Sequence, residues 1–169
     1  MKTLFLVRHA KSSWEDAELA DKDRPLNDRG KRDAPRMAKR VAKRLAKYEV
    51  QPDLILSSSA VRALETAKAM AKRIGFRRKA ILVDDALYRA SVDELLSIVR
   101  KLADGASCVM IFGHNPAMAE FVRRLSGEIV RMPTCAVAEL RFDVGSWSEI
   151  DSAKPLGMTF DYPKRSSRS

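Results

Sequence analysis

The sequence has no long hydrophobic segment and only two cysteines. No apolar run approaches the ~20 residues that a membrane-spanning helix needs. The apolar run at residues 4–7 is shorter than the hydrophobic region of a signal peptide, so we interpret it as a buried strand and expect a cytoplasmic protein. Cys108 and Cys135 could form only one disulfide, and we expect free thiols in a reducing compartment.

Metal-ligand clusters, repeats and linkers are also missing from the sequence. The chain of 169 residues contains two histidines, and no group of Asp, Glu and His residues has the spacing of a metal site. We therefore expect a single domain over residues 1–162, followed by a polar, basic tail at 163–169. We also expect a monomer that needs neither a metal nor a cofactor.

Positive charge is abundant. The chain has 32 Lys and Arg residues against 22 acidic ones, for a net charge of +10, which favours anionic partners. Helical spacing over 31–47 places a row of cations opposite the apolar residues. We interpret this basic face as solvated exterior; the alternatives are binding of nucleic acid or of an acidic protein. No aromatic residues interleave with the cations, which disfavours single-stranded nucleic acid. The cations are Arg32, Arg36, Lys39, Arg40, Lys43, Arg44 and Lys47.

Strand and helix patterns alternate along the chain. Short apolar runs predict strands at 3–7, 53–57, 80–83, 107–112, 136–142 and near 147–150. Amphipathic spacing predicts helices over 31–47, 61–74, 92–102 and 116–125. This alternation predicts an α/β fold, a three-layer α/β/α sandwich around a mixed, mostly parallel sheet. The strand-rich C-terminal end suggests some antiparallel pairing.

Three of the predicted strands run directly into reactive polar residues. Arg8 and His9 follow the first strand, Arg62 comes shortly after the second, and His114 and Asn115 follow the strand at 107–112. Ligands of parallel α/β folds bind at the carboxyl ends of the strands, so these residues are expected to meet in one crevice. Arginines bind phosphoryl oxygens, and a neutral imidazole can attack phosphorus while a second, charged imidazole stabilises the transferring oxygens.

These segments resemble the motifs of a known family. Residues 7–10 (Val-Arg-His-Ala), 57–67 and 113–116 (Gly-His-Asn-Pro) resemble three motifs of the histidine phosphatase superfamily, which includes phosphoglycerate mutase-like enzymes. Residues 24–30 resemble the stretch before its first long helix. The resemblance spans residues 2–160. It implies a phosphoglycerate mutase-like fold and a metal-independent phosphatase in which His9 carries the phosphoryl group and Arg8, Arg62 and His114 hold it.

Two further residues are candidates for contacts with the substrate. Ser12 follows the nucleophile closely, and it could touch phosphate or simply belong to the loop. Asn115 could contact the ligand or cap the helix that follows it.

Within the superfamily, the opening Arg-His-Ala-Lys-Ser-Ser-Trp at 8–14 is typical of SixA-type phosphohistidine phosphatases. The stretch between Arg62 and His114 is too short for the cap inserted in the mutases. An uncapped site can admit a phosphorylated side chain of another protein. The expected partner is therefore a phosphohistidine-bearing signalling or phosphotransfer protein. The alternatives are a phosphatase of small phosphorylated metabolites and, from a different class, a basic module that binds nucleic acid or acidic proteins.

Two departures from the family pattern concern the chemistry. Ala10 replaces the usual glycine after the nucleophile. Ala86 stands where family members that cleave phosphate esters have an acid, although Asp85 or Tyr88 could substitute. Alternatively no strong acid is required, because the leaving group of phosphohistidine is easily protonated. A missing general acid costs ~10²–10⁴-fold in rate, so we expect weak activity on alkyl phosphates.

Cys135 and Arg141 formally match the Cys-x5-Arg loop of cysteine-based phosphatases. The residues between them alternate like a strand, and residues six apart in a strand are ~20 Å apart, too far to share one phosphate. We therefore expect activity to survive in Cys135→Ser.

Overall fold

One mixed sheet forms the centre of the molecule. The structure is a computed structural model that describes residues 1–165, and within them six strands pair in the order β3-β2-β4-β1-β5-β6. The pairs β1–β4, β4–β2 and β2–β3 are parallel, whereas β1–β5 and β5–β6 are antiparallel. The predicted mixed, mostly parallel sheet is thus confirmed. The strands are β1 (Lys2–Arg8), β2 (Leu54–Ser58), β3 (Leu82–Asp84), β4 (Cys108–Gly113), β5 (Val137–Phe142) and β6 (Gly157–Asp161).

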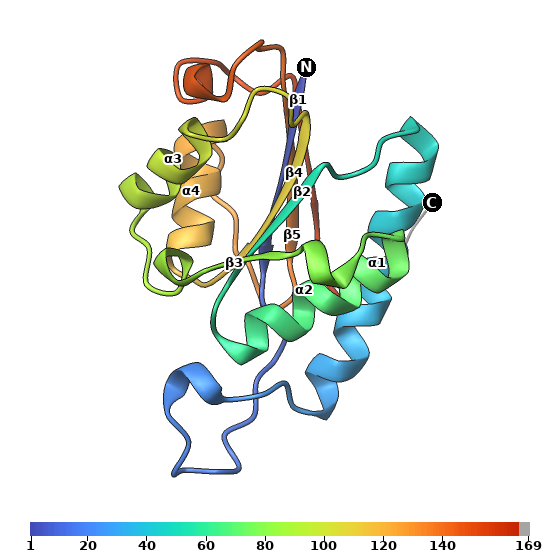
Figure 1. The fold of residues 1–169 in the computed structure, drawn as a ribbon, viewed down its shortest axis with the longest axis vertical. Helices are drawn as coiled ribbons and strands as arrows, with labels where there is room; N and C mark the ends of the chain where they lie inside the picture. The colour runs from blue at the N-terminus through green and yellow to red at the C-terminus, as the bar shows by residue number, and fades with distance from the viewer. Residues whose placement is uncertain (166–169) are drawn as a thin grey trace.

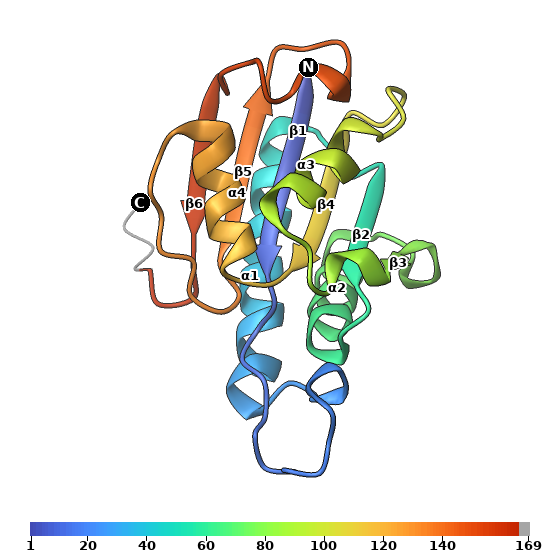
Figure 2. The ribbon, with the colours of Figure 1, turned by 90° about the vertical axis from the view of Figure 1, so that its left-hand side faces the viewer.

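Helices cover both faces of this sheet. Figure 1 looks along the sheet and shows α1 and α2 on one side and α3 and α4 on the other. This arrangement is the predicted three-layer sandwich, and Figure 2 shows the same layers after a quarter turn. The four α-helices of the described residues are α1 (Asp28–Tyr48), α2 (Val61–Ile74), α3 (Val92–Arg100) and α4 (Ala117–Ser126).

The central strand β1 is apolar because both of its faces are covered. Leu4 and Leu6 belong to the core under α3 and α4, whereas Phe5 and Val7 belong to the core under α1 and α2. Alternating side chains point to opposite faces of a strand, so a strand buried on both sides reads as a continuous apolar run. This burial fixes where β1 ends, and therefore where the polar residues after it begin.

The predicted basic face of α1 is smaller than expected. Arg44 reaches the sheet and pairs with Glu139 of β5 at 3.1 Å. Arg40 pairs with Asp161 of β6 at 3.0 Å and donates to the carbonyl of Pro163 at 3.3 Å. These two arginines therefore join α1 to β5 and β6. The other cations of the row are exposed.

The C-terminal region differs from the prediction. The strand expected near 147–150 is wrong: Trp147–Glu149 is a 3-10 turn, and the buried indole of Trp147 donates to the carbonyl of Ala106 at 2.7 Å. The large apolar side chain of Trp147 suggested a buried strand, but a side chain can be buried in a turn as well. The actual last strand is β6, which was missed because its residues are largely half-buried.

Other boundaries shift by a few residues or fall outside the description. The third strand begins two residues later than predicted, at the sheet edge, where Leu82 and Val83 are about half exposed. Pro163, the first residue of the predicted tail, is buried, and residues 166–169 of that tail lie outside the described residues. Among residues 1–165, no helix combines the length and the apolar character that crossing a membrane requires.

Candidate active site

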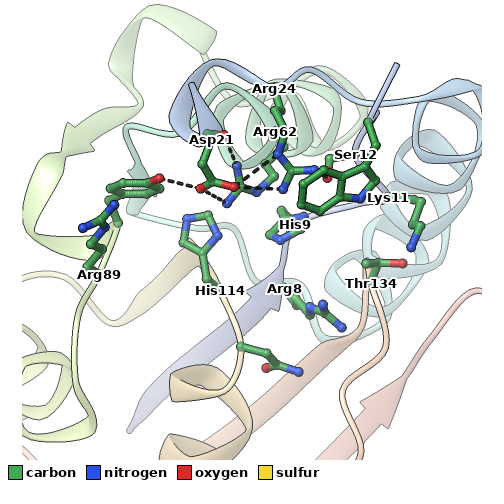
Figure 3. A pocket seen from close by; sticks show the side chains of 13 residues that line it. Arg8, His9, Lys11, Ser12, Asp21, Arg24, Arg62, Arg89, His114 and Thr134 are labelled. Carbon is green, nitrogen blue, oxygen red and sulfur yellow. Dashed lines mark hydrogen bonds and ion pairs between the residues drawn. The ribbon is translucent and has the colours of Figure 1, made fainter. Parts of the chain in front are cut away.

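The carboxyl ends of β1, β4 and β2 surround a cavity of about 310 Å³ (Figure 3). Arg8 pairs with Gly113 in the ladder between β1 and β4, so His9 and His114 follow neighbouring strand ends. Their ring centroids lie 5.1 Å apart. Arg62, from the first turn of α2, completes the group that the sequence predicted, and all four residues line the cavity.

A network of hydrogen bonds fixes the His9 imidazole. His9 is buried, and its Nδ1 lies 2.7 Å from the carbonyl oxygen of Ala10. A carbonyl oxygen can only accept, so Nδ1 carries the proton and Nε2 keeps a free lone pair. The Ala10 amide donates to Oγ1 of Thr66 at 3.0 Å, and that hydroxyl donates to the carbonyl of Arg62 at 2.7 Å. Helix α2 thereby holds the segment that carries His9.

The loop after His9 also rests closely against the start of α1. A Cβ atom added at Gly30 would lie only 2.2 Å from the carbonyl oxygen of Lys11. No side chain fits there, which explains the glycine in the segment 24–30. Asn27 caps the helix, because its side chain accepts a hydrogen bond from the Gly30 amide at 2.9 Å.

Both histidines are neutral at pH 7 in this structure. Burial lowers the pKa of His9 to about 3; the hydrogen bond to Ala10 opposes the shift, and His114, Arg62 and Arg8 add to it. Burial, followed by the charge of Arg62, lowers the pKa of His114 to about 4. Neutral His9 suits a nucleophile. Neutral His114 differs from the charged second imidazole expected from the sequence, because burial, and then the charge of Arg62, disfavours the cationic form.

His114 is oriented by two neighbours. Its Nε2 lies 2.8 Å from Oγ of Ser58, at the end of β2. The Tyr88 ring meets it edge-on, with centroids 5.6 Å apart. These contacts fix the imidazole beside His9 before any ligand binds.

Within residues 1–165, Arg8 and Arg62 each have a hydrogen-bond donor without a partner. Arg8 donates through Nη1 to the carbonyl of Met132 at 3.0 Å, and burial together with the nearby Arg62 lowers its pKa. In the described part of the chain, the Nε atoms of Arg8 and Arg62 are buried without a hydrogen-bond partner. A buried, unpaired donor of a charged group is costly, and an anionic ligand would offset this cost.

Asp21 is a site residue that the sequence analysis missed. Arg62 donates to its main-chain carbonyl at 2.6 Å and to its carboxylate at 2.9 Å, and Arg24 donates to the same carboxylate at 3.2 Å (Figure 3). The Tyr88 hydroxyl also donates to this carboxylate, and this bond together with the two arginines holds the pKa of Asp21 well below its usual range. Asp21 lies in a short 3-10 turn of the polar loop after β1, where no spacing or periodicity marks it.

Ser12 and Asn115 line the cavity as predicted, but their polar atoms already have partners. Ser12 Oγ accepts from Arg24 at 3.0 Å. Asn115 donates to the carbonyl of Met132 at 2.8 Å, and its Oδ1 accepts from the amide of Ala119 in α4 at 3.3 Å. The geometry therefore supports the capping interpretation of Asn115.

The structure does not bring Asp85 into the cavity. Its carboxylate is exposed and accepts hydrogen bonds from Lys22 and Ser59. Lys22, and then Ser59, lower the pKa of Asp85, whereas a general acid needs a raised one. Tyr88, the other substitute considered, does line the cavity.

The cysteine alternative is also unsupported. Cys135 is buried as a free thiol, and burial raises its pKa to about 12, the reverse of an activated nucleophile. Arg141 lies in β5 and pairs across the ladder with Thr3, far along the strand from the carboxyl end of β1. Cys108 is likewise a buried free thiol, as expected. No group of three or more His, Cys, Asp or Glu side chains within residues 1–165 is placed to hold a metal ion.

Comparisons with known proteins agree with this geometry. A family model of the histidine phosphatase superfamily (branch 1) matches residues 4–95. An uncharacterised chloroplast protein of Arabidopsis thaliana is 35% identical over 156 residues, which cover 88% of this chain and 70% of the relative.

Solved structures extend the similarity to the whole fold. A candidate phosphohistidine phosphatase SixA from Agrobacterium tumefaciens is 30% identical, with a TM-score of 0.75 and coverage of 94% of this chain and 97% of that one. The protein histidine phosphatase SixA complexed with tungstate has a TM-score of 0.73 at 22% identity, covering 95% of this chain and 94% of that one. The latter likeness shows the fold alone.

Proposed function

This chain belongs to the histidine phosphatase superfamily and is of the SixA type, and we propose that it dephosphorylates phosphohistidine on a signalling or phosphotransfer protein through a phosphorylated His9. The main support is the state of His9: a neutral imidazole with Nδ1–H fixed on the Ala10 carbonyl, beside two arginines with free donors. Nucleophile, phosphate-binding cations and second imidazole thus surround one cavity.

In the first step, Nε2 of His9 attacks phosphorus and the P–N bond to the substrate histidine breaks. The departing imidazole takes up a proton and leaves neutral. Arg8 and Arg62 hold the phosphoryl oxygens while the group moves. Positioning and charge stabilisation of this kind account for most of the catalysis of phosphoryl transfer. In the second step, water attacks phosphorus, inorganic phosphate departs and His9 regains its lone pair.

The lack of an available acid supports phosphohistidine over a simple ester. Of the described residues that line the cavity, the only carboxylic acid is Asp21, which is ionised and held by Arg62 and Arg24. Tyr88 also lines the cavity, but its hydroxyl already donates to the Asp21 carboxylate. An alkoxide leaving group needs a proton from an acid in the transition state, whereas an imidazole is basic enough to take one from solvent. The proposed ranking is phosphohistidine first and alkyl phosphates last.

Intact-mass measurement under non-denaturing conditions at neutral pH tests this proposal. A histidine-phosphotransfer domain, phosphorylated with phosphoramidate, is mixed with wild type, with His9→Ala or with Asp85→Asn. We expect wild type and Asp85→Asn to remove the phosphoryl group, and His9→Ala to leave it in place. Equal turnover by His9→Ala, or an alkyl phosphate hydrolysed as fast as the phosphoprotein, would contradict the proposal.

A further inference from the structure

A second hollow opens next to the active-site cavity. It is a groove of about 790 Å³ between the loop that follows α4 and the end of β6, two segments that lie side by side in Figure 2. Its lining is mostly apolar, and Ile129 stands at its edge with 80% of its surface exposed. We call this hollow the side groove; its apolar residues include Ala119, Ile129, Val130, Met132, Phe160 and Tyr162.

The side groove and the active-site cavity share a wall. Asn115 lines both. The carbonyl of Met132, a groove residue, accepts hydrogen bonds from Asn115 at 2.8 Å and from Arg8 at 3.0 Å. The segment that forms the groove is therefore bonded directly to an arginine of the active site. A large substrate with its phosphoryl group at His9 would reach the groove by crossing Asn115.

The groove has a basic rim. Its only charged lining residue in the described part of the chain is Arg131, which is exposed. Arg123 is exposed one helical turn after Ala119, on the same side of α4. An apolar floor with cations at its edge complements an apolar side chain flanked by acidic residues. Nucleic acid offers charge without such a side chain, so the chemistry of the groove favours a protein.

We infer that the side groove docks the phosphohistidine-bearing partner protein, by receiving an apolar side chain of that partner beside acidic residues. This inference rests on the proposed function. Single exposed apolar residues are common on protein surfaces, but a contiguous apolar groove that adjoins a catalytic cavity marks an interaction site. The cavity then provides the chemistry and the groove provides recognition of the protein that carries the phosphoryl group.

Substitution of Ile129 tests the groove without touching the active site. Because Ile129 is exposed, Ile129→Asp and Ile129→Lys should leave the fold intact. The matched control is Leu156→Asp, an exposed leucine outside the groove. Each variant is assayed for kcat/KM on the phosphoramidate-phosphorylated histidine-phosphotransfer domain and on para-nitrophenyl phosphate, a small substrate that carries no protein surface to dock.

We expect Ile129→Asp to lower kcat/KM on the phosphoprotein by about tenfold or more, as loss of an interface anchor does, and to leave aryl phosphate hydrolysis unchanged. Ile129→Lys should lose less, because it keeps the rim basic, and Leu156→Asp should match wild type on both substrates. The inference is overturned if Ile129→Asp keeps full activity on the phosphoprotein, or if both substrates fall together.

A second measurement excludes self-association as the role of the groove. If wild type is a dimer in light scattering and Ile129→Asp is a monomer, a second copy occupies the groove and the inference is wrong. Failure of the proposed function has a different signature, since wild type would then not dephosphorylate the phosphoprotein at all, or His9→Ala would do so equally well.

Discussion

Two groups of cations in this molecule carry the same charge in opposite surroundings. Arg8 and Arg62 are largely buried around the cavity, with Nε donors unpaired, and their charges add to the effect of burial, which lowers the pKa values of the two histidines. On the outer face of α1, Arg36, Lys39 and Lys43 are exposed to water. The net charge of +10 counts both groups equally. The cavity arginines differ because they are buried and some of their donors lack a hydrogen-bond partner among the described residues. This state favours the binding of an anion.

Arg40 and Arg44 show a third outcome on the same helix as the exposed cations. They form ion pairs with Asp161 and Glu139 of the sheet, so carboxylates of the protein itself largely neutralise their charge. Arg8 and Arg62 differ from these two arginines because they line the cavity with unpaired Nε donors, where a small anion can reach them.

Removal of Arg62 should have the largest effect. Arg62→Ala takes away a preorganised cation that meets the transferring oxygens, and loss of such a donor typically lowers kcat by about 10²–10³-fold. The matched variant is Arg36→Ala, which removes the same side chain from the outer face of α1 and should keep wild-type rates. Steady-state hydrolysis of para-nitrophenyl phosphate measures both. Comparable losses in the two variants would show that total charge, rather than the buried charge, supports activity.

The buried histidines should make stability depend on pH. Their folded-state pKa values of about 3 and about 4 lie below the ordinary 6.5, so the unfolded chain binds more protons as pH falls below 6.5. The free energy of unfolding should therefore drop between pH 6.5 and 5, with a slope that approaches about 1.4 kcal/mol per pH unit for each histidine. Urea unfolding at several pH values measures the slope.

A histidine variant provides the control for this pH effect. His9→Ala should retain only the contribution of His114, and saturating inorganic phosphate should reduce the slope in wild type, because a bound anion stabilises imidazolium. A slope that stays the same in His9→Ala would assign the pH dependence to other groups.

The polar loop after β1 illustrates the limits of prediction from sequence. The strands that are buried on both faces can be recognised in the sequence as apolar runs. The ends of these runs give the positions of His9 and His114. Asp21 had no such signal, because its place depends on how the loop folds back over Arg62 and Arg24. The outcome for Asp85 has the same cause: it was a possible substitute because it stands next to Ala86, at the position of the family's acid, whereas in the structure Lys22 and Ser59 hold it outside the cavity.

The C-terminal region follows the same rule. Trp147 is buried by contacts with residues distant in sequence, and its turn was mistaken for a strand. Strand β6 lies at a sheet edge and is half-buried, so it has neither a continuous apolar run nor a clear alternation. The sequence therefore predicts the centre of the sheet and its catalytic strand ends well, and the edges and loops poorly.

Asp21 allows a sharper test of the cavity, with a smaller effect. Its carboxylate pairs with Arg62 and Arg24, and an incoming phosphoryl group must compete for the same cations. We expect Asp21→Asn to strengthen competitive inhibition by inorganic phosphate by about tenfold, the effect of 1.4 kcal/mol. Asp85→Asn removes a nearby carboxylate outside the cavity and should change the inhibition constant little. Weaker phosphate inhibition in Asp21→Asn would instead mean that Asp21 positions the arginines.

The smallest effect is expected on the outer face of α1. Lys39 and Lys43 are exposed. At physiological ionic strength, charges more than about 8 Å apart are largely screened. The combined variant Lys39→Glu, Lys43→Glu should therefore change kcat/KM on para-nitrophenyl phosphate and on the phosphoprotein by less than about twofold, and stability by within about 0.5 kcal/mol. A selective loss of kcat/KM on the phosphoprotein would mean that this face docks an acidic partner. The exposed cations of α1 would then be functional, as the buried arginines of the cavity are.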